Sequence, residues 1–328
     1  MRFFHLSDLH IGKQLHRYNL REDQEAILKE VVAYAKDLRP DAIIIAGDIY
    51  DKSVPSAEAV AVFDEFLTSL SEIAPAIALL IISGNHDSAQ RLDYASGILK
   101  SHQIYLAGTA PRIEEEHIRK VTLNDEYGEV DFYLLPFLKP SYVRNVFPGE
   151  PPQTYGDAVA KLIRREEIDY HGRRNVLVSH QFYTGNELPE TCDSETFSVG
   201  GIDNVDIGAV KDFDYVALGH LHGVQSVGMP HIRYCGTLLK YSVSESGQEK
   251  ALTLVTLSQK GAPPKVERLA LHPLRDVKKK RGNLAEILES ANEEERDDYV
   301  SITLTDEVDP YKPKEQLEEV FDRILEVK

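Results

Sequence analysis

Five short apolar segments of this chain each run into residues that can bind a metal ion. They are FFHLSDLH at 3–10, AIIIAGD at 42–48, LLIISGNHD at 79–87, VLVSH at 176–180 and YVALGHLH at 215–222. In an open α/β sheet, functional groups collect at the carboxyl ends of the strands. Buried Asp and His side chains are costly unless they are paired or coordinated. The pattern therefore predicts five strand ends that converge on one metal-binding pocket.

The order of the expected elements predicts an α/β fold. Residues 2–6, 42–46 and 76–82 are strand patterns, and residues 19–38 and 56–70 place apolar side chains at helical spacing. This alternation predicts a mainly parallel sheet that is covered by helices. Further strands are expected at 130–135, 175–179, 214–218, 231–235 and 251–257, with a helix at 154–168. A second sheet packed on the first would give a four-layer α/β sandwich of two mixed sheets flanked by helices.

A domain boundary is expected near Leu271, which divides the chain into residues 1–270 and 271–328. Pro273 and the basic run at 275–282 break the preceding pattern. A small α+β unit should follow, with the order helix, strand, helix, strand at 283–290, 299–305, 314–321 and 324–327. Because nothing follows the last strand, we expect a chain truncated at its C-terminal end.

Composition narrows the class of protein. The apolar fraction of 42% and the charged fraction of 28% are typical of a soluble globular protein. The apolar run at 73–82 contains Pro75 and is too short to cross a bilayer, which needs about 20 residues. Two cysteines without CxxC spacing, Cys192 and Cys235, predict packed thiols in a reducing, cytoplasmic compartment. The net charge of −17 disfavours nucleic acid as a partner unless bound cations supply local positive charge.

Seven residues at the strand ends are candidate metal ligands. Asp8 and His10 share i, i+2 spacing, which places both side chains on one side of an extended segment. Asp48 follows Gly47 at the end of a very apolar strand, where a carboxylate shared by two cations would be well satisfied. The remaining candidates are Asn85, His180, His220 and His222. Imidazole with carboxylate and amide oxygens suits Mn²⁺, Fe²⁺ or Zn²⁺ better than Ca²⁺.

Each block also has a structural explanation when it is taken alone. A D-x-H sequence is often a turn aspartate beside a surface histidine, and single histidines are more often structural than ligating. In Gly84-Asn85-His86-Asp87, Asp87 or Ser88 can cap a following helix. His86 should point away from Asn85 and is a candidate proton or hydrogen-bond donor to a phosphate. His5 lies inside a strand pattern and is expected to be a core or supporting histidine.

The order D-x-H, G-D, G-N-H-D, H and G-H-x-H resembles that of the calcineurin-like metallophosphoesterases. Within them, the segments SDLHIGK at 7–13, AGDIYDKSVPS at 46–56, GNHDSAQRL at 84–92 and HIRYCGTLLKYSVSE at 231–245 resemble the SbcD family of bacterial nucleases. The resemblance implies a DNA exonuclease and hairpin endonuclease that acts in double-strand-break processing with two divalent metal ions. It also implies Mn²⁺ as the metal, with Fe²⁺ and Zn²⁺ as alternatives.

The same resemblance implies partners and an architecture. The partners are DNA, an SbcC-type coiled-coil ATPase and a second copy of the chain, which would meet it through the first two helices. Residues 271–328 resemble the capping domain of the family. Because the chain stops at Lys328, the segment that holds the ATPase is expected to be missing.

The resemblance further implies roles for individual residues. One metal would be bound by Asp8, His10, Asp48 and His222, and the other by Asp48, Asn85, His180 and His220. His86 resembles the catalytic histidine of the family. Asp51 stands where archaeal and eukaryotic relatives often carry a histidine, so the partner of His86 is either Asp51 or a group of the substrate. Lys13, His16 and Arg17 are candidate contacts to DNA phosphates, with a polar surface loop as the alternative.

Two other classes of function remain possible from the sequence. One is a small-molecule or protein phosphoesterase on the same fold, which a comparison of a nucleotide with a DNA hairpin as substrate would identify. The other is a scaffold without catalytic activity. Scaffolds tend to lose metal ligands, whereas all seven candidates are present here.

Overall fold

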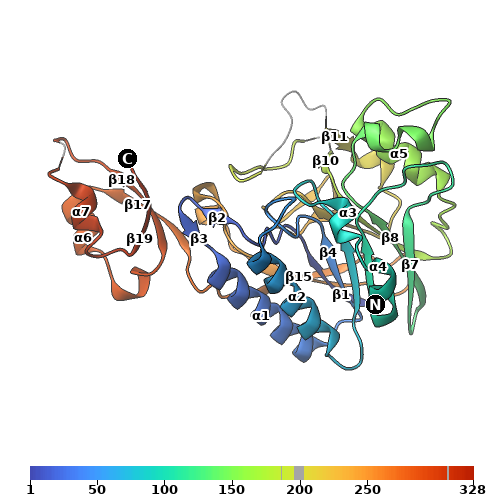
Figure 1. Cartoon of the computed structure of the whole chain (residues 1–328), viewed down its shortest axis with the longest axis horizontal. Helices are drawn as coiled ribbons and strands as arrows, with labels where there is room; N and C mark the ends of the chain where they lie inside the picture. Colours follow the sequence, from blue (N-terminus) through green and yellow to red (C-terminus); the bar gives the residue numbers. More distant parts are fainter. Residues whose placement is uncertain (186, 196–202, 309) are drawn as a thin grey trace.

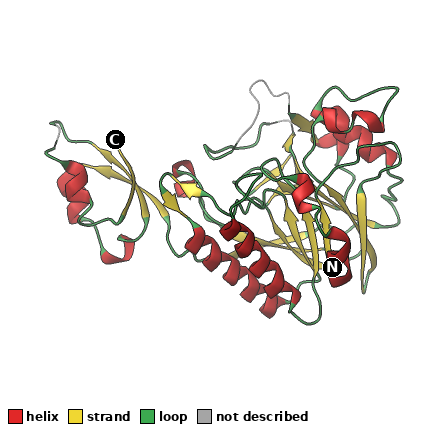
Figure 2. Cartoon of the chain, viewed as in Figure 1, coloured by secondary structure: helices red, strands yellow, loops and turns green. Residues whose placement is uncertain are grey.

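Two six-stranded mixed sheets form the main body of this computed structural model, which describes residues 1–328 except 186, 196–202 and 309 (Figure 1, Figure 2). The first sheet has the order β16-β15-β1-β4-β5-β6. β1, β4, β5 and β6 run parallel to one another, and β15 pairs antiparallel with both β1 and β16. Its strands are β1 (Arg2–Leu6), β4 (Ala42–Ala46), β5 (Ala78–Ile82), β6 (Ile104–Ala107), β15 (Ala251–Thr256) and β16 (Lys265–Ala270).

The second sheet has the order β13-β14-β12-β9-β8-β7, with a parallel centre and an antiparallel strand at each edge. Its strands are β7 (Arg119–Asp125), β8 (Gly128–Leu135), β9 (Arg174–His180), β12 (Tyr215–Gly219), β13 (Gln225–Val227) and β14 (Met229–Tyr234). The mainly parallel arrangement predicted for the first sheet is therefore confirmed, from β1 to the edge strand β6.

Three apolar cores separate four layers, because neighbouring side chains of a strand point to opposite faces. Phe4 and Ile43 of the first sheet pack under α1 (Arg21–Leu38) and α2 (Ala57–Ser71), which lie side by side along one face of the main body (Figure 1). Phe3 packs between the sheets against Phe132 of β8. The outer face of the second sheet is covered by α5 (Tyr155–Arg165). The expected α/β sandwich is confirmed.

Local sequence signals set the starts of two of these helices. The Ser56 side chain accepts a hydrogen bond from the main-chain N–H of Ala59 at 3.2 Å, and Thr154 does the same for Asp157 at 3.1 Å. Such N-caps satisfy main-chain donors that have no partner inside the helix. None of the described helices is long and apolar enough to span a membrane.

Short elements connect the sheets and surround their strand ends. A small hairpin of β2 (Gln14–Leu15) and β3 (Tyr18–Asn19) precedes α1, and β10 (Phe182–Thr184) pairs with β11 (Asn204–Asp206). Two one-turn helices follow β5, α3 (Ala89–Leu92) and α4 (Ser96–Leu99). The 3₁₀ helices are η1 (Lys100–His102), η2 (Pro140–Tyr142), η3 (Arg144–Val146), η4 (Ile207–Ala209), η5 (Val243–Gly247) and η6 (Glu293–Glu295).

The C-terminal unit, residues 271–328, lies to one side of the main body, next to the β2–β3 hairpin (Figure 1). It contains a parallel sheet of β17 (Val277–Gly282), β18 (Tyr299–Leu304) and β19 (Arg323–Val327), with α6 (Leu284–Glu289) and α7 (Pro313–Leu317). Its own core includes Val300, Ile302 and Phe321. Asp23 of α1 joins the two parts, because its carboxylate accepts hydrogen bonds from Arg275 at 3.0 Å and from Tyr299 at 2.9 Å.

The sequence interpretation of residues 277–282 was wrong. This basic run was expected to interrupt regular structure, but it forms the edge strand β17, paired along its whole length with β18. Main-chain hydrogen bonds do not depend on the side chain, and the Glu295 carboxylate pairs with the ammonium groups of Lys278 and Lys280. A strand made of three consecutive lysines and an arginine after Val277 gave no apolar pattern from which it could be predicted.

Phe132 tests the core between the sheets. Its side chain is fully buried and meets Phe3 edge to face, with 5.7 Å between ring centroids. Phe132→Ala should lower the free energy of unfolding by about 3–5 kcal/mol, because the cavity left behind cannot close between two rigid sheets. Denaturant titration followed by circular dichroism measures the change.

The matched control is Ile98→Ala, at a side chain that is 70% exposed. It should change the free energy of unfolding by less than about 0.5 kcal/mol. Equal losses from the two substitutions would contradict the assignment of Phe132 to a tightly packed core.

Candidate metal centre

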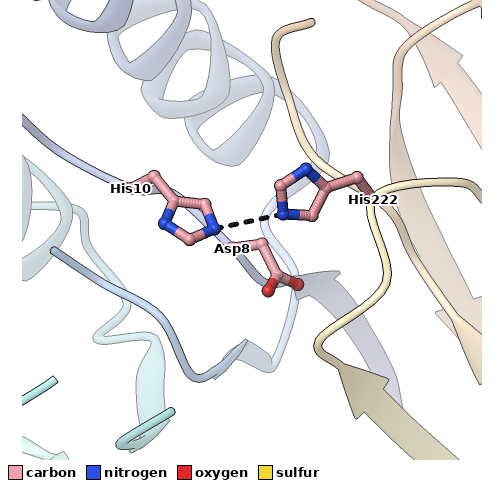
Figure 3. A group of neighbouring side chains, drawn as sticks. All are labelled: Asp8, His10 and His222. Atoms are coloured by element: carbon pink, nitrogen blue, oxygen red, sulfur yellow. Dashed lines mark hydrogen bonds between the residues drawn. The ribbon is translucent and has the colours of Figure 1, made fainter. Parts of the chain in front are cut away.

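All seven candidate ligands lie close together in the folded chain. Nε2 of His10 lies 3.1 Å from Nε2 of His222, with Asp8 next to both rings (Figure 3). Oδ1 of Asn85 lies 3.0 Å from Nε2 of His180 and 2.9 Å from Nδ1 of His220. The predicted convergence of five strand ends is therefore present.

Asp48 lies between the two halves of this group. Its Oδ2 is 3.3 Å from Nε2 of His180 and 3.9 Å from Nε2 of His10, and its Oδ1 accepts the main-chain N–H of His86 at 2.8 Å. Asp48 also belongs to two separate sets of side chains with metal-binding spacing, one with His10 and one with His180. Its position is the one that a bridging carboxylate needs.

The backbone that carries Asp8 and His10 is not extended, so this part of the prediction was wrong. β1 ends at Leu6, and both residues have left-handed backbones, with φ of 52° and 44°. Each such residue costs of order 1–3 kcal/mol. The segment is held by main-chain hydrogen bonds from Asp8 to Gly47 and from His10 to Asp48, both 2.9 Å long. The two side chains still converge, but through this strained loop rather than through strand alternation.

Two glycines leave room for the cluster. Gly47 has a φ of 90°, and a Cβ built on it would lie 2.4 Å from Nδ1 of His180. A Cβ on Gly84 would lie 2.1 Å from Oδ1 of Asp48. The glycines that precede Asp48 and Asn85 are thus required for packing around the ligands, in addition to the turns they permit.

Hydrogen bonds from outside the cluster fix which nitrogen of His180 faces it. Nδ1 of His180 lies 2.7 Å from the carbonyl oxygen of Ala46. A carbonyl can only accept, so Nδ1 carries a proton and donates it. In the neutral ring, Nε2 is then a bare lone pair directed at the oxygens of Asn85 and Asp48. Lone pairs that face one another are satisfied by a shared cation.

The electrostatics of the cluster favour positive charge within it. Burial disfavours the charged forms of His180 and Asp48, but attraction between them outweighs this, raising the pKa of His180 to about 9 and lowering that of Asp48. Burial lowers the pKa of His220 to about 3 and that of His10 well below its usual value, so both rings are neutral. A proton on His180 or a bound cation therefore supplies the positive charge that stabilises the buried carboxylates.

The donor set fits divalent transition metals. It consists of four imidazoles, two carboxylates and one amide oxygen, and it lacks thiolate. Nδ1 of His10 is buried and has no hydrogen-bond partner among the described residues. Cys192 lies near His222, but burial raises the pKa of its thiol, which stays protonated. The seven side chains as a group match the ligands that Mn²⁺, Fe²⁺ and Zn²⁺ prefer.

His86 lies at the edge of the cluster and contacts Asp51 through its main chain. Nδ1 of His86 donates to the carbonyl oxygen of Asp51 at 2.9 Å, which leaves Nε2 without a proton in the neutral ring. The Asp51 carboxylate instead accepts from Nζ of Lys13 at 2.8 Å. Asp87 does not cap α3, because its oxygens accept from the main chain of Ile49, Tyr50 and Gly84.

The other candidates lie at different places around the cluster. Lys13 is half-buried through its pair with Asp51. His16 and Arg17 are exposed on the β2–β3 hairpin, where Arg17 donates to the hydroxyl of Tyr18 at 3.1 Å. The role of Lys13, His16 and Arg17 as contacts to DNA phosphates stays a prediction. His5 is a core residue, with hydrogen bonds to Tyr215 and Leu218 and a pKa lowered to about 3 by burial.

Sequence analysis did not find Glu245 and Ser194, which orient His222. The Ser194 hydroxyl lies 2.6 Å from Oε1 of Glu245 and 2.8 Å from Nδ1 of His222. Because the carboxylate only accepts, Ser194 donates to Glu245 and accepts from Nδ1–H of His222. Nε2 of His222 is thereby left bare and faces His10. Neither residue comes directly after an apolar strand pattern in the sequence. Only their proximity to His222 in the folded chain identifies them.

Glu245 is fully buried and firmly held. Its Oε2 receives the ammonium of Lys250 at 2.7 Å, and its Oε1 receives the main-chain N–H of Tyr241 at 3.2 Å. Burial opposes its ionisation, but the imidazole of His222, 3.6 Å away, and the charge of Lys250 outweigh burial and lower its pKa. The carboxylate is therefore a fixed anchor for the ring of His222.

Asp48→Ala should remove both metal ions, because Asp48 connects the two halves of the cluster. The measurement is the metal content of protein that has been loaded with Mn²⁺ and desalted, determined by mass spectrometry. Asp37→Ala, at an exposed position of α1, is the control and should keep the wild-type content. Two tightly bound ions in Asp48→Ala would refute its bridging position.

Glu245→Gln should weaken Mn²⁺ binding by roughly 10- to 100-fold, the usual effect of losing a partner that orients a ligand. The amide of Gln can donate a hydrogen bond to the Ser194 hydroxyl. Ser194 then no longer has to accept from Nδ1–H of His222, and the tautomer that leaves Nε2 unprotonated loses its support. Calorimetric titration of metal-free protein measures the affinity. The control is Glu249→Gln, an exposed carboxylate nearby, which should bind as the wild type does. Equal affinity of both variants would contradict the role of Glu245.

Comparisons with known proteins place the chain in a family. Residues 1–224 match the family model described as calcineurin-like phosphoesterase, and residues 270–328 match the one described as type 5 capsule protein repressor C-terminal domain. The chain is 32% identical over 329 residues to a protein of Staphylococcus epidermidis that is named as the SbcD component of the nuclease SbcCD, covering 99% of this chain and 84% of that protein.

A solved structure titled GAP50, the anchor in the inner membrane complex of Plasmodium, has a TM-score of 0.48 and 12% identity, covering 100% of this chain and 96% of that one. A likeness at this level supports no argument. The phosphoesterase model implies bound divalent metals, which the donor set described above fits. The family model over the main body and the relative that matches 99% of this chain together show that the chain belongs to the calcineurin-like phosphoesterases and, within them, to the SbcD family.

Proposed function

We propose that this chain is a DNA nuclease that hydrolyses phosphodiester bonds with two divalent metal ions, with exonuclease and hairpin endonuclease activity in double-strand-break processing. The observation that carries the proposal is the convergence of seven ligand-type side chains from five strand ends. A relative of nearly the same extent is named a nuclease, which supports the substrate class. In a scaffold that binds no metal, nothing would offset the free-energy cost of burying these polar side chains.

The seven side chains divide into two overlapping ligand sets. Asp8, His10, Asp48 and His222 would hold one ion, which the short contacts among His10, His222 and Asp8 support. Asp48, Asn85, His180 and His220 would hold the other, as their contacts of 2.9–3.3 Å support. Bound there, divalent cations neutralise phosphate charge and lower the pKa of water. We propose Mn²⁺ as the metal, with Fe²⁺ and Zn²⁺ as alternatives.

His86 is the proposed catalytic residue of the chain. Its Nδ1–H is held by the Asp51 carbonyl, so the ring keeps a fixed orientation with Nε2 available to the substrate. In the protonated ring, Nε2–H can donate to a phosphate oxygen or to the leaving oxygen. Asp51 then supports catalysis in two ways, by orienting His86 through its main chain and by holding Lys13 near the site through its carboxylate.

The remaining proposals concern architecture and partners. Residues 1–270 form the nuclease domain and residues 271–328 the capping domain, which the separate core of the C-terminal unit supports. The name of the relative supports an SbcC-type ATPase as the partner. The proposed location is the cytoplasm. A homodimer through α1 and α2 is also part of the proposal. Lys13, His16 and Arg17 are the proposed contacts to DNA phosphates.

The function is tested by Mn²⁺-dependent cleavage of duplex, hairpin and single-stranded DNA by the wild type and by His86→Gln. We expect the wild type to cut DNA and His86→Gln to lose about 10²- to 10⁴-fold in rate, the usual contribution of a general acid or base. The metal content of the variant should equal that of the wild type, because His86 belongs to neither ligand set.

Three outcomes would contradict parts of this proposal. Loss of a metal ion together with activity would make His86 a ligand. Hydrolysis of a mononucleotide or a phosphoprotein by a wild type that leaves DNA intact would indicate a phosphoesterase of another substrate class. A metal-loaded wild type that hydrolyses none of these substrates would indicate a scaffold.

A further inference from the structure

A cavity of about 500 Å³ lies beside the candidate metal centre. Asn85 and His220 line this cavity and also belong to the ligand cluster, so the cavity opens directly onto the centre. Its volume is within the range of about 300–1,000 Å³ that is common for small-molecule sites. It is too small for a double helix but large enough for a single nucleotide.

Aromatic side chains form much of the cavity wall. Phe137, Tyr142, Tyr155 and Phe182 all line it. The rings of Phe137 and Tyr155 lie 6.4 Å apart, and that of Phe182 lies 6.2 Å from the ring of His220. Tyr142 is 49% exposed, so part of its ring surface is open to a flat ligand. Aromatic side chains of this kind stack on nucleobases without reading their sequence.

Two cations at the cavity have no carboxylate partner among the described residues. Neither Arg112 nor Lys139 forms an ion pair with any residue that the structure describes, although both line the cavity. The acidic residues of the lining are Asp203 and Asp87, and the oxygens of Asp87 already accept main-chain N–H groups. Arg112 and Lys139 are thus suited to an anionic group that enters from outside.

We propose that this cavity binds the nucleobase and the adjacent phosphate of an unstacked nucleotide next to the bond that is cut. The base would stack on Tyr142, and Lys139 and Arg112 would contact its phosphate. This proposal rests on the proposed nuclease function and deepens it. Lys13 lies at the other half of the cluster, near His10, so the strand would pass from Lys13 across the centre into the cavity.

The first test compares Tyr142→Ala with the wild type on two substrates, both with Mn²⁺. One is a single-stranded oligonucleotide, and the other is bis(p-nitrophenyl) phosphate, a small diester that has no base. The KM for the oligonucleotide should rise about tenfold more than the KM for the small diester, as expected when one base loses its stacking partner. Tyr142→Phe, which keeps the ring, should restore the wild-type KM.

Removing the base from the substrate is the complementary test. An oligonucleotide whose nucleotide beside the cut lacks its base should show a raised KM with the wild type, and Tyr142→Ala should raise it no further. Non-additive effects of this kind are expected for two groups in direct contact. The matched control is Tyr127→Ala, which removes a tyrosine that is 48% exposed at the β7–β8 turn and should leave the KM of every substrate unchanged.

Lys139→Gln tests the phosphate contact. The slope of log KM for the oligonucleotide against log salt concentration should become shallower by about 0.7, the value for one contact to a single strand. The corresponding slope for bis(p-nitrophenyl) phosphate should change by less than that for the oligonucleotide.

The outcomes separate this proposal from the one on which it rests. If the wild type cuts DNA but Tyr142→Ala has a wild-type KM, or affects both substrates equally, the cavity proposal is overturned and the nuclease function stands. If the wild type hydrolyses bis(p-nitrophenyl) phosphate but leaves DNA intact, both proposals are overturned. An unchanged salt slope in Lys139→Gln would remove the phosphate contact from the proposal.

Discussion

The structure depends on how buried hydrogen-bond acceptors are accommodated at the ends of five strands. Asp8, Asp48, Asn85 and the bare nitrogens of several histidines lie within a few ångströms of one another, away from water. Such a set is unfavourable unless positive charge is placed inside it. A proton on His180 supplies part of this positive charge, and bound metal ions would supply the rest. The left-handed backbones of Asp8, His10 and Asp48 are strain that the surrounding sheets keep in place.

Contacts outside the cluster decide the orientation of its rings. The Ala46 carbonyl fixes His180, the Ser194–Glu245 pair fixes His222, and the Asp51 carbonyl fixes His86. In each case an oxygen accepts a hydrogen bond from Nδ1–H, so that Nε2 is directed at the site. The three contacts use the same chemistry, although they come from unrelated parts of the chain. The protein thereby sets ring tautomers before any ligand arrives.

The surroundings of the cluster differ on its two sides. On the side of His10, Lys13 is already paired with Asp51, and the C-terminal unit is joined to α1 through Asp23. On the side of Asn85 and His220, the aromatic cavity carries two cations that pair with no carboxylate in the described part of the chain. The basic run of the C-terminal unit contributes less free charge than its sequence suggests, because Arg275, Lys278 and Lys280 are all in ion pairs. The two cations of the cavity are therefore better placed than Arg275, Lys278 and Lys280 to attract an anion next to the cluster.

The sequence by itself determined the central strands and the three long helices of the main body, and the identity of the clustered residues, because apolar periodicity and strand-end position are local properties. It did not show that residues 277–282 form a strand, since main-chain pairing needs no apolar side chains. It also misjudged how Asp8 and His10 meet, because the left-handed loop is imposed by hydrogen bonds to residues 47–49. Only the tertiary structure decided that Glu245 and Ser194 hold His222, and that the main chain of Asp51 holds His86. These contacts join segments far apart in sequence, and their geometry exists only after the two sheets have packed.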